Sequence, residues 1–576
     1  MKLLGELARM KRPFSGNACC TANGVWFLLF AVLMVGCGFK GSQADVVLHN
    51  GVILTMDEMG SEAQAVAVRG GRVIDVGAER AILNKYAAAQ QVDLMGAVLV
   101  PGLMDAHAHF VGFAKGLAVA NLVGTKSEEE VLAKAKVQAE QVAGWVLGRG
   151  WDQNDWAEGQ FPDRHDALDA MFPDRPVLLE RVDGHAVWAN AKALDIAGFT
   201  TESAVFGGEL LRNADGELTG VVLDKAADSL QALVPEPDST RLAQLMVAAS
   251  ERCVAAGLTH ITDAGLGPQD VEAIDALQQS GELPLRFSVM VSDDPDALDH
   301  FLPRGPRIDT SSMLDVRAVK FYMDGALGSR GAALLEPYSD RPESSGYFLQ
   351  DEDEYRAKIE RTKAAGFQVA THCIGDAAVR RVLQNYGELL GGVNDLRWRI
   401  EHAQVVQRAD VSAFSEFTVI PSIQPTHATS DMYWAGQRLG RNRVRRAYIY
   451  STLQNQLGWL PLGTDFPVEG IEPLRTFYAA TVRKDVEGWP EGGYQMDEAL
   501  SREAGLRGMT AWAALACFHE NDLGQVAPGY RADFTVLDRN LLTVPSEALL
   551  DAQVLQTWIG GERVFERGMG SSVLTP

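Results

Sequence analysis

The sequence predicts an α/β protein in which one (β/α)8 barrel carries a small sheet domain built from both ends of the chain. Short apolar or β-rich runs alternate with helical patterns through the middle of the chain, and polar residues end several of these runs. Strand signals also gather on both sides of this middle part. Strand–helix alternation favours parallel strands, and a barrel keeps its active site at the C-terminal ends of its strands.

Length and composition narrow the possible classes of protein. The chain has 576 residues and a formal net charge of −24, which repels phosphate backbones and argues against nucleic-acid binding. At roughly 100–200 residues per domain, the length fits about three domains or one decorated barrel. Six cysteines in this length exclude a disulfide scaffold, and the absence of a CxxC pair argues against a cysteine-built zinc site.

An apolar run near the N-terminus is typical of a secretory signal. Val25–Gly36 carries no charge, and Lys11 and Arg12 precede it. The run is shorter than the roughly 20 residues of a membrane span. Charged residues before a short apolar run and small residues after it are the pattern of a signal peptide. An uncleaved membrane anchor is the alternative interpretation.

The end of this run, residues 34–37, reads MVGC and resembles a bacterial lipobox. This resemblance makes residues 1–36 a lipoprotein-type signal peptide and Cys37 the lipidated first residue of the mature chain. The charged region is unusually long when counted from Met1, so Met10 is the expected start of translation. We therefore expect a bacterial cell-envelope protein that faces the periplasm or the exterior and is held to the membrane by Cys37.

Strand-rich segments at the two ends are expected to share one domain. Residues 45–100 contain several apolar or alternating runs between Gly and Asn breaks, and residues 531–538 and 554–566 contain further short strands. We assign residues 38–98 and 524–576 to this sheet domain. The intervening residues form the predicted barrel, 99–523.

The first candidate metal ligands lie in the segment PGLMDAHAHF. His107 and His109 are two residues apart, so a strand presents both imidazoles on the same face. Imidazole nitrogen suits zinc and similar divalent ions. An HxH pair alone is weak support, because it also arises by chance.

Four further residues each follow or end an apolar run. They are Lys320, His372, His402 and Asp465. Each alone has an ordinary structural explanation, as a surface lysine, a core histidine or a capping aspartate. Together they occupy the positions at which barrel strands deliver side chains to one rim.

Their spacing agrees with barrel units of roughly 30 residues. His372 and His402 are 30 residues apart and His402 and Asp465 are 63 apart, which correspond to one and two units. Lys320 precedes His372 by 52 residues, one unit with a long loop. This order places the four residues on strands four, five, six and eight. The distance from the first strand to Lys320 leaves about 120 surplus residues, placed as an insertion at about 115–235.

The ordered set of motifs resembles the amidohydrolase superfamily, metal-dependent hydrolases with a distorted (β/α)8 TIM barrel and a small β-sandwich. Within it the chain is most similar to the branch that includes N-substituted formamide deformylase. The segments that carry the resemblance span nearly the whole chain after the signal and include PGLMDAHAHF, ERVDGHAVWANAKAL, VKFYMDGALGSRGAAL, THCIGDAAV, RIEHAQ, LPLGTDFPVE and GYRADFTVLD.

The resemblance implies a binuclear metal site, with two zinc ions per chain as the expected cofactor. His107 and His109 match the ligands from the first strand, and Lys320 matches a lysine that is carboxylated and bridges the two metals. The second metal would be held by His372 and His402. Asp465 matches the aspartate of the eighth strand, which in the family binds a metal and also acts as the proton shuttle. Cys373 and Thr464 stand where Ala and Ser are expected.

The expected reaction is cleavage of a C–N bond in an amide or N-formyl small molecule by a metal-bound hydroxide, with Asp465 as proton shuttle. A deaminase is the first alternative, although the segment after His372 lacks the HxxE arrangement of many deaminases. Carbamate, ester or lactone hydrolysis uses the same hydroxide. A non-catalytic, lipid-anchored metal-binding protein is the remaining alternative, and a homo-oligomer is compatible with all of these.

Six further residues are candidates for substrate contact. The resemblance places His185 in the insertion facing the substrate, although a structural histidine fits the sequence nearly as well. Three candidates are expected on the loop after strand four and two on the loop after strand seven. The five are Tyr322, Asp324, Arg330, Gln424 and His427.

Overall fold

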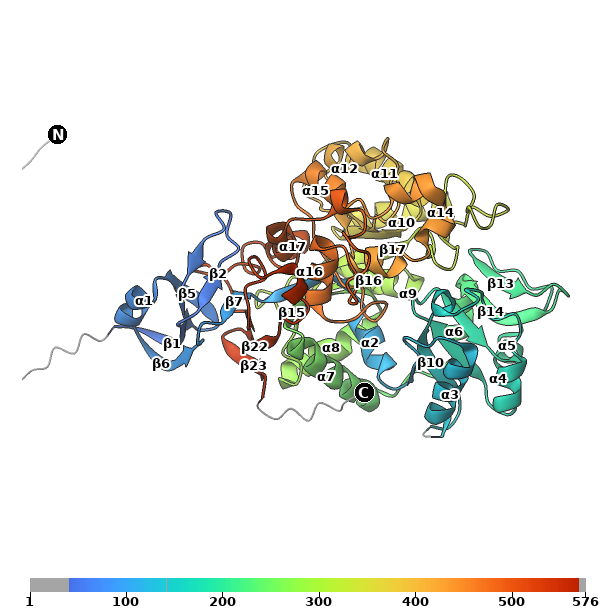
Figure 1. The fold of residues 1–576 in the computed structure, drawn as a ribbon, viewed down its shortest axis with the longest axis horizontal. Helices are drawn as coiled ribbons and strands as arrows, with labels where there is room; N and C mark the ends of the chain where they lie inside the picture. Colours follow the sequence, from blue (N-terminus) through green and yellow to red (C-terminus); the bar gives the residue numbers. More distant parts are fainter. Residues whose placement is uncertain (1–40, 141, 569–576) are drawn as a thin grey trace, which may run out of the picture. The chain divides into compact units, whose positions relative to one another are not determined.

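A computed structural model describes residues 41–140 and 142–568, and its centre is a barrel of parallel strands (Figure 1). Seven strands pair side by side in the order β20-β19-β18-β17-β16-β15-β8. Their bounds are β8 (Leu103–Ala108), β15 (Leu258–Leu266), β16 (Arg286–Ser292), β17 (Leu314–Tyr322), β18 (Gln368–Cys373), β19 (Arg399–His402) and β20 (Ile420–Ser422). Nearly every residue of these strands is buried, as expected for parallel strands covered by helices. The predicted fold class is confirmed.

The eighth position of the barrel is not a full strand. Leu462 forms a single parallel bridge with Ile423, and its carbonyl accepts a hydrogen bond from the backbone N–H of Ala106 on β8. The backbone N–H of Asp465 donates to the carbonyl of His107. This short segment therefore lies between β20 and β8 and closes the barrel, where a regular eighth strand was expected.

Helices surround the barrel strands. The helices that come after β15 in the chain are α8 (Pro268–Ser280), α9 (Pro295–Phe301), α10 (Glu352–Ala364), α11 (Asp376–Leu390), α12 (Val411–Glu416), α13 (Thr426–Asp431), α14 (Ala435–Arg443), α15 (Tyr450–Leu457), α16 (Pro473–Thr481), α17 (Arg502–Gly508) and α18 (Ala511–Ala516). In α11 the residues at positions 379, 382, 383 and 386 are buried. This spacing places them on one face of the helix, which packs against the barrel.

Between β8 and β15 the chain forms a separate mixed sheet, in the order β13-β14-β12-β11-β10-β9. Its strands are β9 (Ala120–Asn121), β10 (Val146–Trp151), β11 (Val177–Arg181), β12 (Ala186–Ala189), β13 (Gly208–Arg212) and β14 (Leu218–Asp224). The helices of this stretch are α2 (Phe110–Gly116), α3 (Glu128–Ala139), α4 (Asp166–Met171), α5 (Ala191–Ala197), α6 (Lys225–Gln231) and α7 (Ser239–Ala255). Trp151 and Trp156 stack in one apolar cluster of this sheet, so they serve packing.

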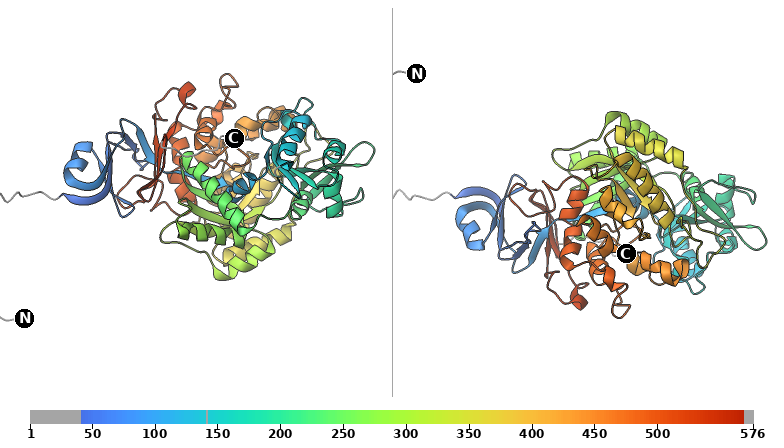
Figure 2. Two further views of the ribbon diagram at one scale, coloured as in Figure 1. Left: turned by 90° about the horizontal axis from the view of Figure 1, so that it is seen from below. Right: turned by 90° about the horizontal axis from the view of Figure 1, so that it is seen from above.

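The two ends of the described chain supply two further sheets. One has the order β5-β4-β1-β6, with β1 (Ser42–His49), β4 (Ala65–Arg69), β5 (Arg72–Gly77) and β6 (Tyr86–Asp93), and α1 (Glu79–Lys85) lies beside it. The other has the order β23-β22-β21-β7-β2-β3, with β2 (Val52–Leu54), β3 (Glu62–Ala63), β7 (Val98–Pro101), β21 (Phe534–Leu537), β22 (Val554–Ile559) and β23 (Glu562–Glu566). Strand β21 pairs antiparallel with β7, so the C-terminal strands lie beside the N-terminal ones (Figure 2).

The predicted signal segment and Cys37 lie outside the described residues. Within the described part of the chain, none of the helices has the length and apolar character that a bilayer span requires.

Candidate metal centre

His107 and His109 lie where β8 ends and α2 begins. Their Nδ1 atoms each have a hydrogen-bond partner: that of His107 lies 2.6 Å from Glu401 Oε2, and that of His109 lies 2.9 Å from the carbonyl oxygen of Ala264. Their Nε2 atoms lie 3.6 Å and 3.1 Å from Asp465 Oδ1. Strand alternation and these Nδ1 bonds therefore direct both Nε2 atoms to the same point.

Lys320, near the end of β17, is fully buried and reaches this point from the fourth strand. Its Nζ lies 3.3 Å from His107 Nε2. Burial lowers the pKa of Lys320 to about 8, because the ammonium loses its hydration inside the barrel. The neutral amine, which has a free lone pair, is therefore accessible near neutral pH.

His372 is the last residue but one of β18, His402 ends the neighbouring strand β19, and their ring centroids are 4.5 Å apart. Burial lowers the pKa of both imidazoles well below the usual value, so both are neutral. Within the described residues, His372 Nε2 and His402 Nδ1 are buried and lack a hydrogen-bond partner. His402 also has a φ of +70°, a conformation that costs energy in a non-glycine residue and is found at functional sites.

Asp465 follows the bridge that closes the barrel, with a φ of +64°. The approach of its segment to β8 requires Gly463, because a Cβ there would lie 2.6 Å from the backbone nitrogen of His107. Asp465 Oδ2 lies 3.1 Å from His427 Nε2. The ligand atoms of His107, His402 and Asp465 all lie within 4.8 Å of one another.

These residues fit a divalent metal. Four imidazoles, a carboxylate and a buried lysine converge at one end of the barrel, and several of their polar atoms have no protein partner in the described chain. A buried polar atom without a partner costs about 1–3 kcal/mol, which metal ligation removes. Nitrogen and oxygen donors in this mixture suit zinc and related ions.

Glu401 is part of the site, although the sequence did not point to it. Its buried carboxylate accepts from His107 Nδ1 and pairs with Arg399, whose Nε lies 2.6 Å from Glu401 Oε1. Burial alone would raise the pKa of Glu401, but Arg399 and His107 lower it below its usual range. The sequence did contain a signal for this role: Arg399 and Glu401 are oppositely charged residues two positions apart inside an apolar strand, so both point to the same face.

The metal centre opens into a cavity of about 2330 Å³. The strand ends of the barrel line one side through residues that include His109, Lys320 and His372. The sheet between β8 and β15 lines the other side through residues that include Arg181 and His185. The cavity therefore has room for a small organic molecule beside the metal ligands.

Three of the six candidate substrate residues line this cavity: His185, Tyr322 and His427. Tyr322 is the last residue of β17, and His427 lies in α13, so neither lies on the loop where it was expected. Strand β17 runs two residues past Lys320, which accounts for the position of Tyr322.

The other three candidates do not line the cavity. The buried carboxylate of Asp324 accepts hydrogen bonds from three backbone N–H groups of neighbouring loops. Arg330 pairs with Asp340 at 2.8 Å, and buried Gln424 donates to the carbonyl of Ser422. Their contacts hold loops in place.

His185 has partners that sequence inspection did not reveal. Its Nδ1 lies 2.7 Å from Asp224 Oδ1, and the hydroxyl of Tyr347 donates to the other oxygen of Asp224. Burial alone would lower the pKa of His185, but the bond to Asp224 raises it to about 9. The ring centroids of His185 and His372 are 5.2 Å apart, so a positively charged donor stands beside the metal ligands.

Comparison with known proteins agrees with this geometry. A profile of the Amidohydrolase family matches residues 90–565. Putative amidohydrolase YtcJ of Bacillus subtilis is 31% identical over 535 residues, which cover 90% of this chain and 99% of that protein. N-substituted formamide deformylase of Arthrobacter pascens is 26% identical over 543 residues, 91% of this chain and 98% of that enzyme.

A solved structure shares the architecture. An uncharacterized metal-dependent hydrolase from Pyrococcus horikoshii superposes with a TM-score of 0.70 and 26% identity, covering 87% of this chain and 99% of that one. The predicted resemblance is thus confirmed at the level of the superfamily.

Proposed function

This chain belongs to the amidohydrolase family, and from this premise we propose that it hydrolyses a C–N bond in an amide or N-formyl small molecule. The observation that carries the proposal is the convergence of the six predicted ligands on one end of the barrel, where a cavity of about 2330 Å³ begins. The similarity to N-substituted formamide deformylase supports an N-formyl or N-acyl substrate.

We assign His107, His109, Lys320, His372 and His402 together with Asp465 to two divalent metal ions, and propose zinc. Bound metals of this kind lower the pKa of water and polarise a carbonyl oxygen. Lys320 becomes an anionic ligand if its neutral amine adds carbon dioxide and loses a proton. The pKa of about 8 and the 3.3 Å distance to His107 Nε2 support this modification.

Asp465 is the proton carrier in this proposal. One of its oxygens lies 3.1 Å from His109 Nε2 and the other lies 3.1 Å from His427 Nε2. His427 is held in turn by Glu469, whose Oε1 lies 3.1 Å from Nδ1. His427 therefore orients the carboxylate, which takes a proton from the attacking water and delivers it to the leaving nitrogen.

His185 is the proposed contact for the substrate acyl group. Its Nδ1 is occupied by Asp224, so its Nε2 is the nitrogen left to bond the substrate. A charged donor there stabilises negative charge that develops on a carbonyl oxygen. The insertion thereby contributes a binding group to a site whose metal ligands come from the barrel.

A hydrolysis screen tests the activity. Zinc-loaded protein is incubated with N-formyl and N-acyl amines, and with carbamates, esters, lactones and aminopurines as the competing classes. Cleavage of the formyl or acyl amines is expected, with loss on chelation and recovery on adding zinc. Asp465→Asn should lose about 10²–10⁴-fold in kcat while keeping its fold, whereas the exposed Asp497→Asn serves as the matched control.

The screen can also contradict the proposal. Turnover of esters or aminopurines with none of amides would reassign the reaction. Full activity in Asp465→Asn would remove the proton-carrier role.

A lipid anchor at Cys37 is proposed as well, on the strength of the MVGC segment. Expression in a bacterium with a labelled fatty acid should label the protein in the membrane fraction. Cys37→Ser should abolish the label and Cys20→Ser should retain it. A label that persists in Cys37→Ser would exclude this anchor.

A further inference from the structure

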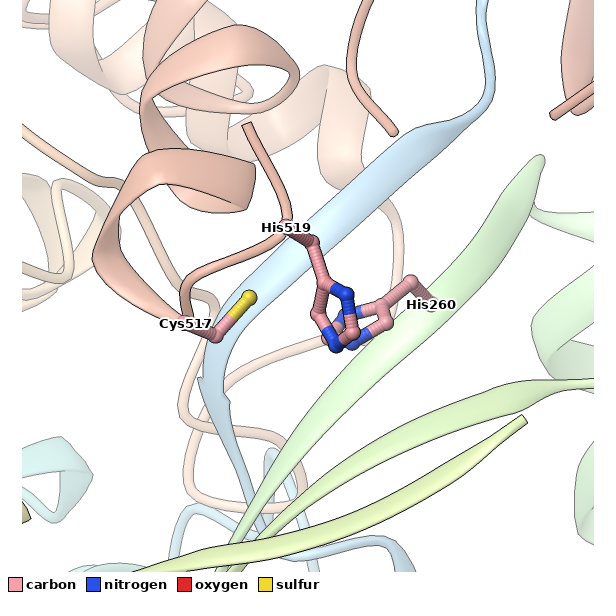
Figure 3. Close-up of side chains that lie close together, drawn as sticks. All are labelled: His260, Cys517 and His519. Atoms are coloured by element: carbon pink, nitrogen blue, oxygen red, sulfur yellow. The ribbon is translucent and has the colours of Figure 1, made fainter. Parts of the chain in front are cut away.

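Three side chains gather inside the barrel at the end opposite to the metal centre. His260 lies on β15, and Cys517 and His519 follow α18. All three are buried, and one ligand atom from each lies within 4.8 Å of the others. Figure 3 shows their tips turned toward one another. We call these three residues the basal cluster.

The basal cluster is separate from the catalytic ligands. His260 precedes Ala264, the residue that holds His109, by four positions, which is about 13 Å along a strand. An apolar layer of Ala264, Met290, Ala318 and Ala370 lies on strands β15 to β18 between the two groups.

His260 brings an unpartnered ring nitrogen to the basal cluster. It is 1% exposed, and its Nδ1 has no hydrogen-bond partner in the described part of the chain. Its Nε2 lies 2.9 Å from Ser288 Oγ. Burial lowers the pKa of His260 well below the usual value, so the ring is neutral. A neutral, buried and partly unsatisfied imidazole is a good ligand and an expensive core residue.

A carboxylate stands next to His519. Asp315, the second residue of β17, is 1% exposed, and its Oδ2 lies 3.3 Å from His519 Nε2. That oxygen has no other partner within the described residues. This is the distance of an ion pair, and the carboxylate lies beside the three ligand atoms of the basal cluster rather than among them.

Cys517 has a thiol that burial keeps protonated. Its pKa is raised to about 11, and Sγ lies 3.2 Å from the carbonyl oxygen of Ala513. Capping the end of α18 explains the thiol, and the pair with Asp315 explains His519, but neither explains the unpartnered Nδ1 of His260. A metal ion deprotonates a coordinating thiol outright, so the thiol becomes a thiolate when an ion binds.

We propose that the basal cluster binds one structural zinc ion. Its two imidazoles and one thiolate supply three of the four donors that zinc takes in closed structural sites, and a turn of the Asp315 side chain toward the ion would supply the fourth. The thiolate and the Asp315 carboxylate together balance the two positive charges of the ion. The positive charge of Arg286, which acts on His260, is already balanced by Asp533 at 2.6 Å and 3.0 Å.

The site would join parts of the chain that are far apart in sequence. Strand β15 supplies one ligand and the segment between α18 and β21 supplies two, with Asp315 of β17 beside them. That segment leads from the barrel into the sheet that contains β7 and β21. The ion would therefore fix the connection between barrel and sheet.

Cobalt substitution of the whole protein tests the proposal without measuring hydrolysis. Cobalt bound to a thiolate shows a strong charge-transfer absorption in the near ultraviolet, which the nitrogen and oxygen ligands of the catalytic centre do not produce. We expect this band in the wild type and in the controls Cys253→Ser and Cys373→Ser. Cys517→Ser should lose the band and bind one zinc fewer per chain, while its hydrolytic activity is retained.

Several results would overturn the assignment. They are the absence of the band in wild-type protein loaded with excess cobalt, its survival in Cys517→Ser, and its loss in either control variant. If Cys517→Ser does not fold, anomalous scattering from crystals of the wild-type protein, measured at the zinc edge, tests the site instead. A peak within bonding distance of Cys517 Sγ supports the site, and an anomalous map without one rejects it.

Discussion

Glu401 determines which ring nitrogen of His107 faces the centre of the barrel. Its carboxylate lies 2.6 Å from Nδ1, so the proton stays on that nitrogen and Nε2 keeps its lone pair. Carboxylate partners of this kind fix the orientation of a metal-binding imidazole and raise its basicity. Arg399 keeps the carboxylate ionised although it is fully buried.

Glu401→Gln should lower the affinity for the catalytic metals by about 10–100-fold. The amide cannot accept from Nδ1 as strongly, and it leaves Arg399 without its counter-charge. Titration of the metal-free protein with zinc in the presence of a competing chelator measures the effect. Glu562→Gln, at an exposed position, should bind as the wild type does. Equal affinity in both variants would show that Glu401 does not support the ligand.

The candidate metal ligands were predictable as an ordered set, although each alone also fits a structural role. His372 is the last residue but one of β18 and His402 is the last residue of β19, in agreement with their spacing. Asp224 and Tyr347 gave no such signal, because their role depends on contact with His185, and these partners are distant in sequence. Contacts between residues so far apart in sequence depend on how the loops fold, and the apolar pattern of a sequence gives no information about that.

At the scale of elements, the sheet between β8 and β15 provides the wall that faces the metal centre. His185 precedes β12 and Asp224 ends β14, and these two strands pair antiparallel. The backbone N–H of Asp224 donates to the carbonyl of His185, which fixes the two residues as a unit. The strand pairing thus sets the direction of the imidazole.

Asp224→Asn should reduce kcat/KM by about 10–100-fold, the effect of weakening one charge-assisted hydrogen bond. His185→Gln should give a similar loss, and the double variant should lose little more than either single one, since both changes disrupt the same unit. Steady-state kinetics at unchanged metal content measure this. Asp215→Asn, exposed in the same part of the chain, is the control. Additive losses would mean that Asp224 acts independently of His185.

The apolar pattern of the sequence predicted the regular barrel strands better than it predicted the segment that closes the barrel. Pro461 and Pro467 flank Asp465 and lack the N–H groups that a strand ladder requires, so only the single bridge at Leu462 forms. The length between His109 and Lys320 predicted surplus residues but not their mixed sheet. Its strands are short, and their order in space differs from their order in sequence.

At the scale of the whole molecule, Asp522 joins the sheets and the barrel. Its carboxylate pairs with Arg72 of β5 at 2.5 Å and with Arg531 at 2.9 Å, and it accepts a hydrogen bond from Ser312 before β17. Partial burial alone would raise the pKa of Asp522, but the bonds from Ser312, Arg72 and Arg531 lower it to about 2. The ionised carboxylate is therefore favoured in the folded protein.

This shift predicts how the stability depends on pH. A carboxyl with a folded pKa of about 2 and an ordinary pKa of 3.8 stabilises the protein above about pH 4, and loses that contribution as the pH falls toward 2. After allowance for solvent screening the contribution is about 1–2 kcal/mol. Urea unfolding of wild type and Asp522→Asn should differ by this amount at pH 7 and converge below pH 4. Asp497→Asn should match the wild type throughout. A difference that stays constant down to pH 2 would show that the amide acts through packing rather than through charge.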